Sequence, residues 1–266
     1  MAPEDLNQTA AGIPPAGATG KPAKKQESWL EVVKTIVYAL LIAGVIRSFI
    51  FQPFNIPSGS MVPTLLIGDY LFVSKFSYGY SRYSLPFGLP LLSGRLFFTP
   101  PDRGDVAVFK LPRDNATDYI KRIIGVPGDH IQMKSGQLYI NGIMVKRERI
   151  EDYVYREGNT AIRLAQYTET LPNGRQHRII KMGDNERLDN TKEFVVPPSH
   201  YFMMGDNRDN SSDSRDPNGG VGYVPVENLV GRAEFLFFST DGSAHLWEPW
   251  KWPFAIRYNR PFEAIR

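Results

Sequence analysis

The chain has 266 residues, of which 42% are hydrophobic and 22% are charged, a composition that excludes wholesale disorder. The net charge is only +3 and the basic residues are spread along the chain, so nothing indicates a nucleic-acid-binding surface. Cysteine is absent, which excludes thiol nucleophiles, thiolate metal sites, iron–sulfur clusters and disulfide bonds.

The N-terminal part changes character abruptly. Residues 1–28 are rich in Ala, Pro and Gly and contain no aromatic residue, which predicts a flexible tail. The following segment, 29–51, is the most apolar of the chain. Its uninterrupted run, Thr35–Ile46, has the length of a core helix or signal-peptide core, but the window Val32–Phe51 can cross a bilayer and is charged only near its ends. We expect a membrane anchor; an amphipathic helix packed on a soluble part is the alternative.

The charges beside this segment predict its orientation. Lys21, Lys24, Lys25 and Lys34 lie on its N-terminal side, whereas only Arg47 is close on the other side. Because basic residues accumulate on the cytoplasmic side of membrane spans, we expect residues 1–28 in the cytoplasm and everything after residue 51 across the membrane.

Beyond residue 51 the pattern is that of a mainly β protein. Short apolar runs bounded by Gly, Pro and Asp predict strands, and no helical patterns alternate with them, which argues against a parallel α/β fold. Asn141-Gly142 after one run is typical of a tight hairpin turn. Residues 143–199 are more polar and less regular, which indicates an inserted subdomain. The predicted strands are Asp69–Ser74, Asp105–Leu111, Tyr119–Val126, His130–Ile140 and Arg232–Phe238.

Two segments, 76–98 and 246–254, combine aromatic residues with Pro and Gly and carry few charges. In a chain tethered to a bilayer, such loops are expected to dip into the membrane interface. The alternative is that their side chains belong to the protein core.

The strongest candidate for a catalytic segment is 56–65, with the sequence Ile-Pro-Ser-Gly-Ser-Met-Val-Pro-Thr-Leu. Its two prolines exclude a regular helix and a central strand. In an extended chain Ser58 and Ser60 point to the same side, and Gly59 lets another backbone approach closely. This arrangement suits a nucleophilic hydroxyl with a second hydroxyl and a backbone N–H as oxyanion donors. An ordinary Ser/Gly/Pro turn is the alternative.

A serine nucleophile needs a base. The motif G-x-S-x-G is absent, and none of the four histidines lies in a motif typical of a Ser-His-Asp triad. A lysine whose pKa is lowered by burial is the other choice. Lys121 shares a strand face with Tyr119 and Ile123, so its amine could be shielded from water. Lys110, within Val108-Phe109-Lys110-Leu111, could be shielded in the same way, and strand periodicity does not choose between the two lysines. The histidines are His130, His177, His200 and His245.

The segment 204–216 is dense in Asp, Asn, Ser and Arg. Its best register as a calcium loop places Pro225 where a bidentate glutamate is needed, so no metal site is predicted and no cofactor is expected. A polar network that supports an active site is favoured over a plain surface loop. A near-copy, Met182-Gly183-Asp184-Asn185, lacks the serines that follow.

Taken together, these segments resemble the bacterial type I signal peptidases (leader peptidases), serine proteases with a Ser/Lys dyad. The resemblance extends from Trp29 onward and leaves out the tail. The matching motifs, in order behind the apolar segment, are Pro57-Ser58-Gly59-Ser60-Met61 with Pro63-Thr64-Leu65, Arg103-Gly104-Asp105-Val106 running to Phe109-Lys110, Tyr119-Ile120-Lys121-Arg122 with Gly125-Val126-Pro127-Gly128-Asp129, and Gly205-Asp206-Asn207-Arg208-Asp209-Asn210-Ser211 to Asp213-Ser214-Arg215.

The resemblance implies a role for each matching residue. Ser60 corresponds to the nucleophile, and Lys121, rather than Lys110, corresponds to the general base. Ser58 corresponds to the oxyanion-hole hydroxyl, which works with the backbone N–H of Ser60. The supporting residues implied in the same way are Ser211, which orients the lysine, and the pair Asp213 and Arg215.

The resemblance also implies a fold and a reaction. Residues 52–129 and 200–266 would form an antiparallel β catalytic domain, interrupted by an inserted β domain at 130–199. Family members remove signal peptides from exported preproteins after small residues at positions −1 and −3, and the substrate would bind as an added strand. The side chains implied to wall its pockets are Phe54, Ile56, Pro57, Met61, Leu65, Tyr119 and Ile120.

The expected location is the bacterial cytoplasmic membrane, crossed once, with the catalytic part on the periplasmic side. The expected partners are signal peptides, the lipid bilayer and the secretion translocon. Two other interpretations stay open. A self-cleaving repressor with a Ser/Lys pair would need a DNA-binding domain, which residues 1–51 do not offer. An inactive scaffold of the export machinery would be expected to have lost Ser60 or Lys121, and both are present.

Overall fold

The structure is a computed structural model that describes residues 29–84, 94–157, 160–244 and 247–266. Its long helix, α1 (Trp29–Phe49), occupies most of the apolar segment, and strand β1 (Phe51–Asn55) begins directly after it. At about 1.5 Å per residue the helix is ~31 Å long, which matches the hydrocarbon core of a bilayer. By length and composition it is able to cross a membrane. Its apolar side chains point in all directions, unlike those of an amphipathic helix.

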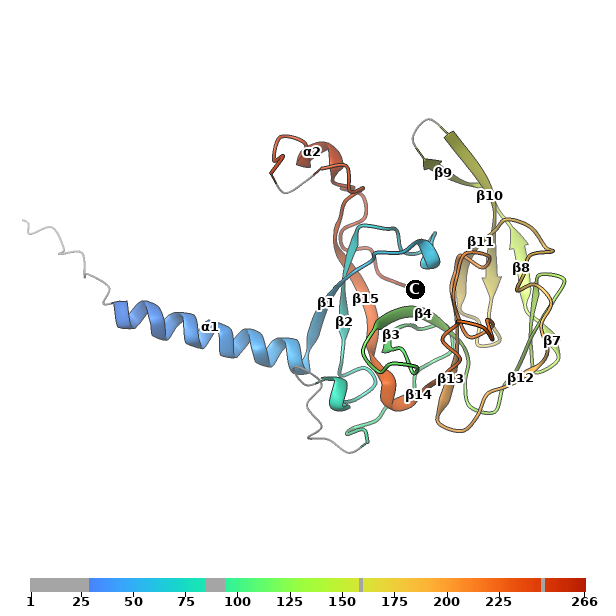
Figure 1. Cartoon of the computed structure of the whole chain (residues 1–266), viewed down its shortest axis with the longest axis horizontal. Helices are drawn as coiled ribbons and strands as arrows, with labels where there is room; N and C mark the ends of the chain where they lie inside the picture. The colour runs from blue at the N-terminus through green and yellow to red at the C-terminus, as the bar shows by residue number, and fades with distance from the viewer. Residues whose placement is uncertain (1–28, 85–93, 158–159, 245–246) are drawn as a thin grey trace, which may run out of the picture. The chain divides into compact units, whose positions relative to one another are not determined.

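Residues 42–266 form one compact unit, and the helix up to Leu41 belongs to another. The larger unit is built on a seven-stranded antiparallel sheet with the order β1-β2-β15-β3-β4-β13-β14 (Figure 1). β1 therefore lies at one edge of this sheet. The other strands are β2 (Asp69–Ser74), β3 (Val106–Lys110), β4 (Asp118–Gly125), β13 (His200–Met204), β14 (Tyr223–Pro225) and β15 (Leu229–Ser239).

The large sheet curls around one apolar cluster (Figure 1). Phe54 of β1 and Ile120 of β4 pack against one apolar cluster, although β2, β15 and β3 lie between their strands. The buried members of the cluster are Ile56, Met61, Leu65, Leu71, Val73, Val106, Val108, Val230, Ala233 and Leu236.

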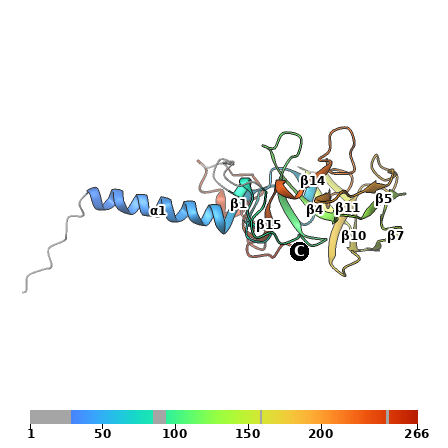
Figure 2. The same ribbon diagram turned by 90° about the horizontal axis from the view of Figure 1, so that it is seen from below.

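Residues 130–195 form two further antiparallel sheets, which both views place beyond β4, away from β1 and β15 (Figure 1, Figure 2). One has the order β12-β5-β6-β7, and the other has the order β11-β10-β8 with β9 also paired to β10. The division into a catalytic and an inserted domain stays a prediction. The strands are β5 (His130–Lys134), β6 (Gln137–Ile140), β7 (Ile143–Met144), β8 (Lys146–Arg149), β9 (Tyr153–Glu157), β10 (Thr160–Thr170), β11 (Gln176–Lys181) and β12 (Phe194–Val195).

The prediction of a mainly antiparallel β fold is confirmed, and β2 has the predicted bounds. The prediction of one continuous strand at 130–140 is wrong. Ser135 and Gly136 break it into β5 and β6, because both adopt positive φ angles, 47° and 72°, in a tight turn. The predicted turn at Asn141-Gly142 is present between β6 and β7, with φ angles of 54° and 77°.

The short helical elements are η1 (Gly59–Met61), η2 (Arg82–Ser84), η4 (Val226–Asn228) and α2 (Trp252–Ala255). The aromatic segments divide between core and surface: Tyr78 is buried, whereas Phe76, Phe97, Trp247 and Trp250 are exposed. Residues 85–93 and 246 of these segments lie outside the described residues, and their depth in a membrane stays a prediction.

Candidate active site

The serine segment is a turn rather than an extended chain. Ser58 is extended, with φ −128° and ψ 153°, but Gly59–Met61 forms the 3-10 turn η1. The turn is favoured because it places Met61 completely inside the core cluster. The two serine side chains nevertheless face each other, with 3.4 Å between their Oγ atoms. The turn thus presents two adjacent hydroxyls.

The side chain of Lys121 reaches this turn from β4. Its Nζ donates a hydrogen bond to Oγ of Ser60 at 2.7 Å and another to the carbonyl oxygen of Ile120 at 2.9 Å. Only 3% of the residue is exposed. Burial lowers the pKa of Lys121 from 10.5 to about 8, although the charges of Asp213 and Asp206 act in the opposite direction. At pH 7 about one-tenth of this amine is therefore unprotonated and able to accept a proton, and the fraction rises with pH.

Lys110, the other lysine left open by the sequence, lies elsewhere. Its Nζ pairs with Asp118 at 2.9 Å and donates to the carbonyl oxygen of Ala116 at 2.7 Å. Of the two lysines, Lys121 is the one in contact with Ser60.

The loop after β13 holds the serine turn by its backbone. The backbone N–H of Asn207 donates to the carbonyl oxygen of Ser60, and its side-chain amide donates to that of Gly59, both at 3.1 Å. Gly205 lets the loop come this close, since a Cβ at this position would lie 2.5 Å from the Ser60 carbonyl oxygen. The position of the nucleophile therefore depends on residues far away in the sequence.

Arg122 and Asp206 form a buried ion pair next to Asn207, the residue that holds the serine turn. Nε and Nη2 of the arginine donate to the two carboxylate oxygens at 2.8 and 2.7 Å, and Thr64 donates to the same carboxylate at 2.5 Å. Burial would raise the pKa of Asp206, but the charge of Arg122 holds it below its usual value. Sequence reasoning assigned this pair no role. The available signal was an arginine within an apolar strand, which requires a buried acidic partner.

The supporting residues implied by the resemblance surround Gly205. Asp213 accepts the backbone N–H of Gly205 at 3.0 Å and two hydrogen bonds from Arg215 at 2.9 and 2.8 Å. Ser211 is buried with its Oγ beside Gly205. Within the described residues this hydroxyl makes no hydrogen bond to Lys121, so the orienting contact implied for Ser211 is not formed here.

The residues implied as pocket walls differ in their accessibility. Phe54 and Ile120 are partly exposed where they pack on the core cluster, and Pro57 is exposed. Tyr119 packs in a different cluster, with its ring 6.2 Å from that of Phe109. The remaining three, which are buried in the core cluster, are Ile56, Met61 and Leu65.

Two stretches of strand edge near Ser60 have no strand partner within the described residues. β1 is the edge strand of the large sheet, paired only with β2. In β4, residues 118–121 pair with β3 on one side, whereas β13 pairs on the other side only from Arg122 onward. Their free N–H and C=O groups are able to bind an extended peptide.

The loop residues 206–209 also reach the neighbouring sheet. Arg208 forms a buried ion pair with Glu169 of β10, with one N–O distance of 2.7 Å. Asp209 accepts a hydrogen bond from Lys181 of β11 at 2.9 Å. The four consecutive side chains thus contact Arg122, the serine turn, β10 and β11 in order.

The histidines that the structure describes have other surroundings. His177 is buried beside Glu169, with 3.5 Å between Nε2 and Oε2. Burial, with a contribution from Arg122, lowers the pKa of His177 to about 3. His130 pairs with Glu193, and Nδ1 of His200 lies 2.8 Å from the carbonyl oxygen of Pro198. Across the described ranges, no group of three His, Asp or Glu residues is placed to hold a metal ion.

Comparison with known proteins shows the family to which the chain belongs. The family model described as signal peptidase, peptidase S26, matches residues 29–238. Signal peptidase I of Rickettsia conorii (strain ATCC VR-613 / Malish 7) is 44% identical over 84% of this chain and 82% of that protein. Signal peptidase I of Rickettsia typhi (strain ATCC VR-144 / Wilmington) is 44% identical over 77% and 79% of the two chains.

A crystal structure of a signal peptidase I from Enterococcus faecalis V583 is 24% identical, and the match covers 50% of this chain and 97% of that one. Its TM-score of 0.29 is too low to bear on the fold. The family model and the Rickettsia relatives, by contrast, extend over most of the sequence. The chain therefore belongs to the signal peptidase family, peptidase S26, a family of serine peptidases.

Proposed function

We propose that the chain is a membrane-bound endopeptidase that removes signal peptides from exported preproteins with a Ser60/Lys121 dyad. The observation that supports this most directly is the 2.7 Å hydrogen bond between Nζ of Lys121 and Oγ of Ser60. The lysine is buried and its pKa is lowered to about 8. A nucleophile within hydrogen-bond distance of a base whose pKa lies near the physiological range is the arrangement that acyl transfer requires.

The reaction follows from these positions. Neutral Lys121 accepts the proton of Ser60 while Oγ attacks the scissile carbonyl carbon. The hydroxyl of Ser58 and the backbone N–H of Ser60 donate hydrogen bonds to the resulting oxyanion. The C–N bond then breaks, and the leaving amine takes the proton from the Lys121 ammonium group. Lys121 next deprotonates a water molecule, whose oxygen attacks the acyl ester. The ester C–Oγ bond then breaks, Ser60 Oγ takes the proton back from the Lys121 ammonium group, and the signal-peptide acid leaves and loses its proton to solvent.

The free edges of β1 and β4 support binding of the substrate as an added strand. Backbone hydrogen bonds would supply affinity and leave selection to the side-chain pockets. Phe54, Pro57 and Ile120 are accessible apolar walls on either side of the dyad. Walls of this size favour small residues at positions −1 and −3 and exclude large ones.

Helix α1 would anchor the enzyme in the cytoplasmic membrane, with residues 1–28 in the cytoplasm. The length and apolarity of the helix and the lysines before it support this topology. The large sheet, from 52–129 and 200–266, would be the catalytic domain on the periplasmic side, with 130–199 as the inserted domain. Signal peptides, the bilayer and the secretion translocon would be its partners.

The test uses the full chain in detergent with a preprotein that carries an Ala-X-Ala site. Ser60→Ala and Lys121→Met should lower cleavage by at least about a thousandfold, since each removes one member of the dyad. Ser212→Ala and Lys134→Met change an exposed serine and an exposed lysine, so they are the matched controls and should cleave normally. Mass spectrometry of the product locates the cleaved bond, and thermal unfolding verifies that each variant is folded.

Two results would contradict the proposal. If Ser60→Ala or Lys121→Met cleaves as the unmodified protein does, the dyad is not the catalytic machinery. If the unmodified protein leaves intact a preprotein that a control peptidase processes, an inactive scaffold of the export machinery becomes the better explanation.

A further inference from the structure

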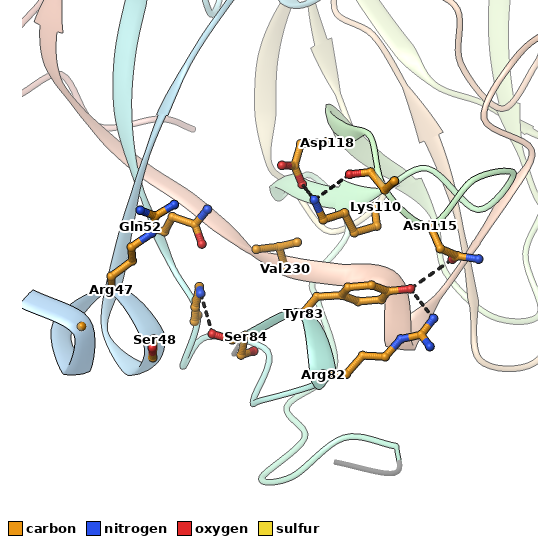
Figure 3. Close-up of a pocket in the computed structure, with 13 residues that line it drawn as sticks. Arg47, Ser48, Gln52, Arg82, Tyr83, Ser84, Lys110, Asn115, Asp118 and Val230 are labelled. Carbon is orange, nitrogen blue, oxygen red and sulfur yellow. Dashed lines mark hydrogen bonds and ion pairs between the residues drawn. The ribbon is translucent and has the colours of Figure 1, made fainter. Parts of the chain in front are cut away.

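A cavity of about 700 Å³ lies beside the large sheet, and neither Ser60 nor Lys121 lines it (Figure 3). Four strands of the sheet, β1, β15, β3 and β4, contribute to its wall, as do Lys75 directly after β2, the last turns of α1 and the turn η2. It is therefore a feature of the fold rather than a gap between loops. The residues that line it are Gly44, Arg47, Ser48, Gln52, Lys75, Arg82, Tyr83, Ser84, Lys110, Asn115, Ala116, Asp118 and Val230.

The lining of this cavity is strongly cationic. Its basic side chains are Arg47, Lys75, Arg82 and Lys110, and its one carboxylate is Asp118. That carboxylate is already bound to Lys110 at 2.9 Å, as Figure 3 shows. The other basic side chains have no carboxylate partner in the described part of the chain. The cavity thus carries an excess of positive charge.

Lys75 is the unusual member of this set. Only 3% of the residue is exposed, and its Nζ donates to the carbonyl oxygen of Ser84 at 2.7 Å instead of pairing with an acid. Burial and the charge of Arg47 lower the pKa of Lys75 to about 8. A buried ammonium group without an acidic partner is costly, and an anion in the cavity would remove that cost.

Exposed apolar side chains gather beside the cavity, at the end of α1. The ring of Phe49 lies 5.6 Å from that of Tyr80, which pairs with Leu96, and the ring of Phe76 lies 5.8 Å from that of Phe51. Phe49, Phe76 and Leu96 are each about half exposed. An apolar surface where an apolar helix ends is typical of a segment at the membrane interface, the level at which lipid headgroups lie.

We propose that this cavity binds the phosphate group of an anionic membrane lipid. The phosphate oxygens would accept hydrogen bonds from Lys75, Arg47 and Arg82, and the acyl chains would leave past the apolar side chains at the end of α1. The proposal rests on the membrane anchoring proposed for α1 but not on catalysis. Its readout is lipid binding, so it can fail while the peptidase proposal stands, and the reverse also holds.

The test measures binding to the full chain in a neutral detergent by native mass spectrometry. The probes are dihexanoyl phosphatidylglycerol, dihexanoyl phosphatidylcholine and inorganic phosphate. The variants are Lys75→Met and the double variant Arg47→Gln/Arg82→Gln, which alters exposed side chains and so has the smaller effect on folding. Lys134→Gln/Lys192→Gln is the matched control, because it changes the net charge equally at exposed positions outside the cavity.

Phosphatidylglycerol should bind more tightly than either other probe. Its affinity should fall about fivefold in Lys75→Met and about 25-fold in the double variant, taking a factor of about five per basic residue near a lipid surface. The control should bind as the unmodified protein does. Unchanged affinity in both cavity variants would overturn the proposal. Equal affinity for inorganic phosphate would overturn the lipid assignment, and displacement of the lipid by a synthetic signal peptide would reassign the cavity to the substrate.

Discussion

The proposed role of Lys121 as the base predicts how cleavage depends on pH. With a pKa of about 8, the amine is about one-tenth neutral at pH 7 and about nine-tenths neutral at pH 9. The value of kcat/KM should therefore rise about tenfold between these pH values and then level off. With an ordinary pKa of 10.5, the same interval would give a rise of about a hundredfold with no plateau.

A second titrating lysine complicates this assignment, because the pKa of Lys75 is also lowered to about 8. Lys75→Met should keep the midpoint of the normalised pH profile, since Lys75 does not contact Ser60. Asp213→Asn should move the midpoint to lower pH, because the negative charge of Asp213 raises the pKa of Lys121. The unpaired Arg215 left by this variant would act in the same direction.

The assay is the initial rate of cleavage of an Ala-X-Ala peptide at low substrate concentration, from pH 5 to pH 10 at constant ionic strength. Asp184→Asn, an exposed acidic residue, is the matched control for Asp213→Asn and should leave the midpoint in place. A flat profile from pH 5 to 9, a hundredfold rise without a plateau, or a midpoint that follows Lys75→Met would refute the reasoning.

Three other predictions concern the surroundings of the dyad. His177 has its pKa lowered to about 3, so protonation of the unfolded chain should reduce the unfolding free energy by up to about 1.4 kcal/mol per pH unit as pH falls below 6.5. His177→Gln should remove this slope in urea unfolding, and identical slopes would contradict it. Glu169→Gln leaves a buried arginine unpaired and should cost about 3–5 kcal/mol in urea unfolding. The exposed Glu148→Gln should cost less than about 1 kcal/mol, and equal losses would argue against the buried pair. Gly205→Ala should lower kcat about a hundredfold in a cleavage assay, because the added Cβ displaces the serine turn. Gly183→Ala, where there is space for a Cβ, is the control and should keep the rate of the unmodified protein. Equal rates for the two variants would refute this prediction.

The sequence predicted most of the strands of the large sheet, because their apolar runs end at Gly, Pro or Asp. It did not predict the break at Ser135-Gly136, since the apolar alternation continues on both sides of that turn. The extended form expected for the serine segment was also wrong at Gly59–Met61. Burial of Met61 favours a turn there, and burial depends on strands that come much later in the chain.

The choice of lysine for the dyad could not be made from the strand pattern alone. Strand periodicity left Lys110 and Lys121 equivalent, and only the family resemblance chose between them. In the structure they differ because Lys110 forms a salt bridge with Asp118, whereas Lys121 donates to Ser60 and, among the described residues, pairs with no carboxylate. Likewise, an isolated motif does not reveal that Asp206 belongs to Arg122, since such pairing depends on how the sheet curls.

The contacts of the loop 206–209 limit how residues 130–199 could be deleted or replaced. A minimal version without residues 130–199 would lose Glu169 and Lys181, the partners of Arg208 and Asp209. Both unpaired charges would then turn toward solvent and displace Asn207, which directly precedes them and whose hydrogen bonds hold the serine turn. Residues 130–199 therefore cannot be removed without disturbing the serine turn. A replacement of this region by that of a relative would have to keep acidic and basic partners for Arg208 and Asp209.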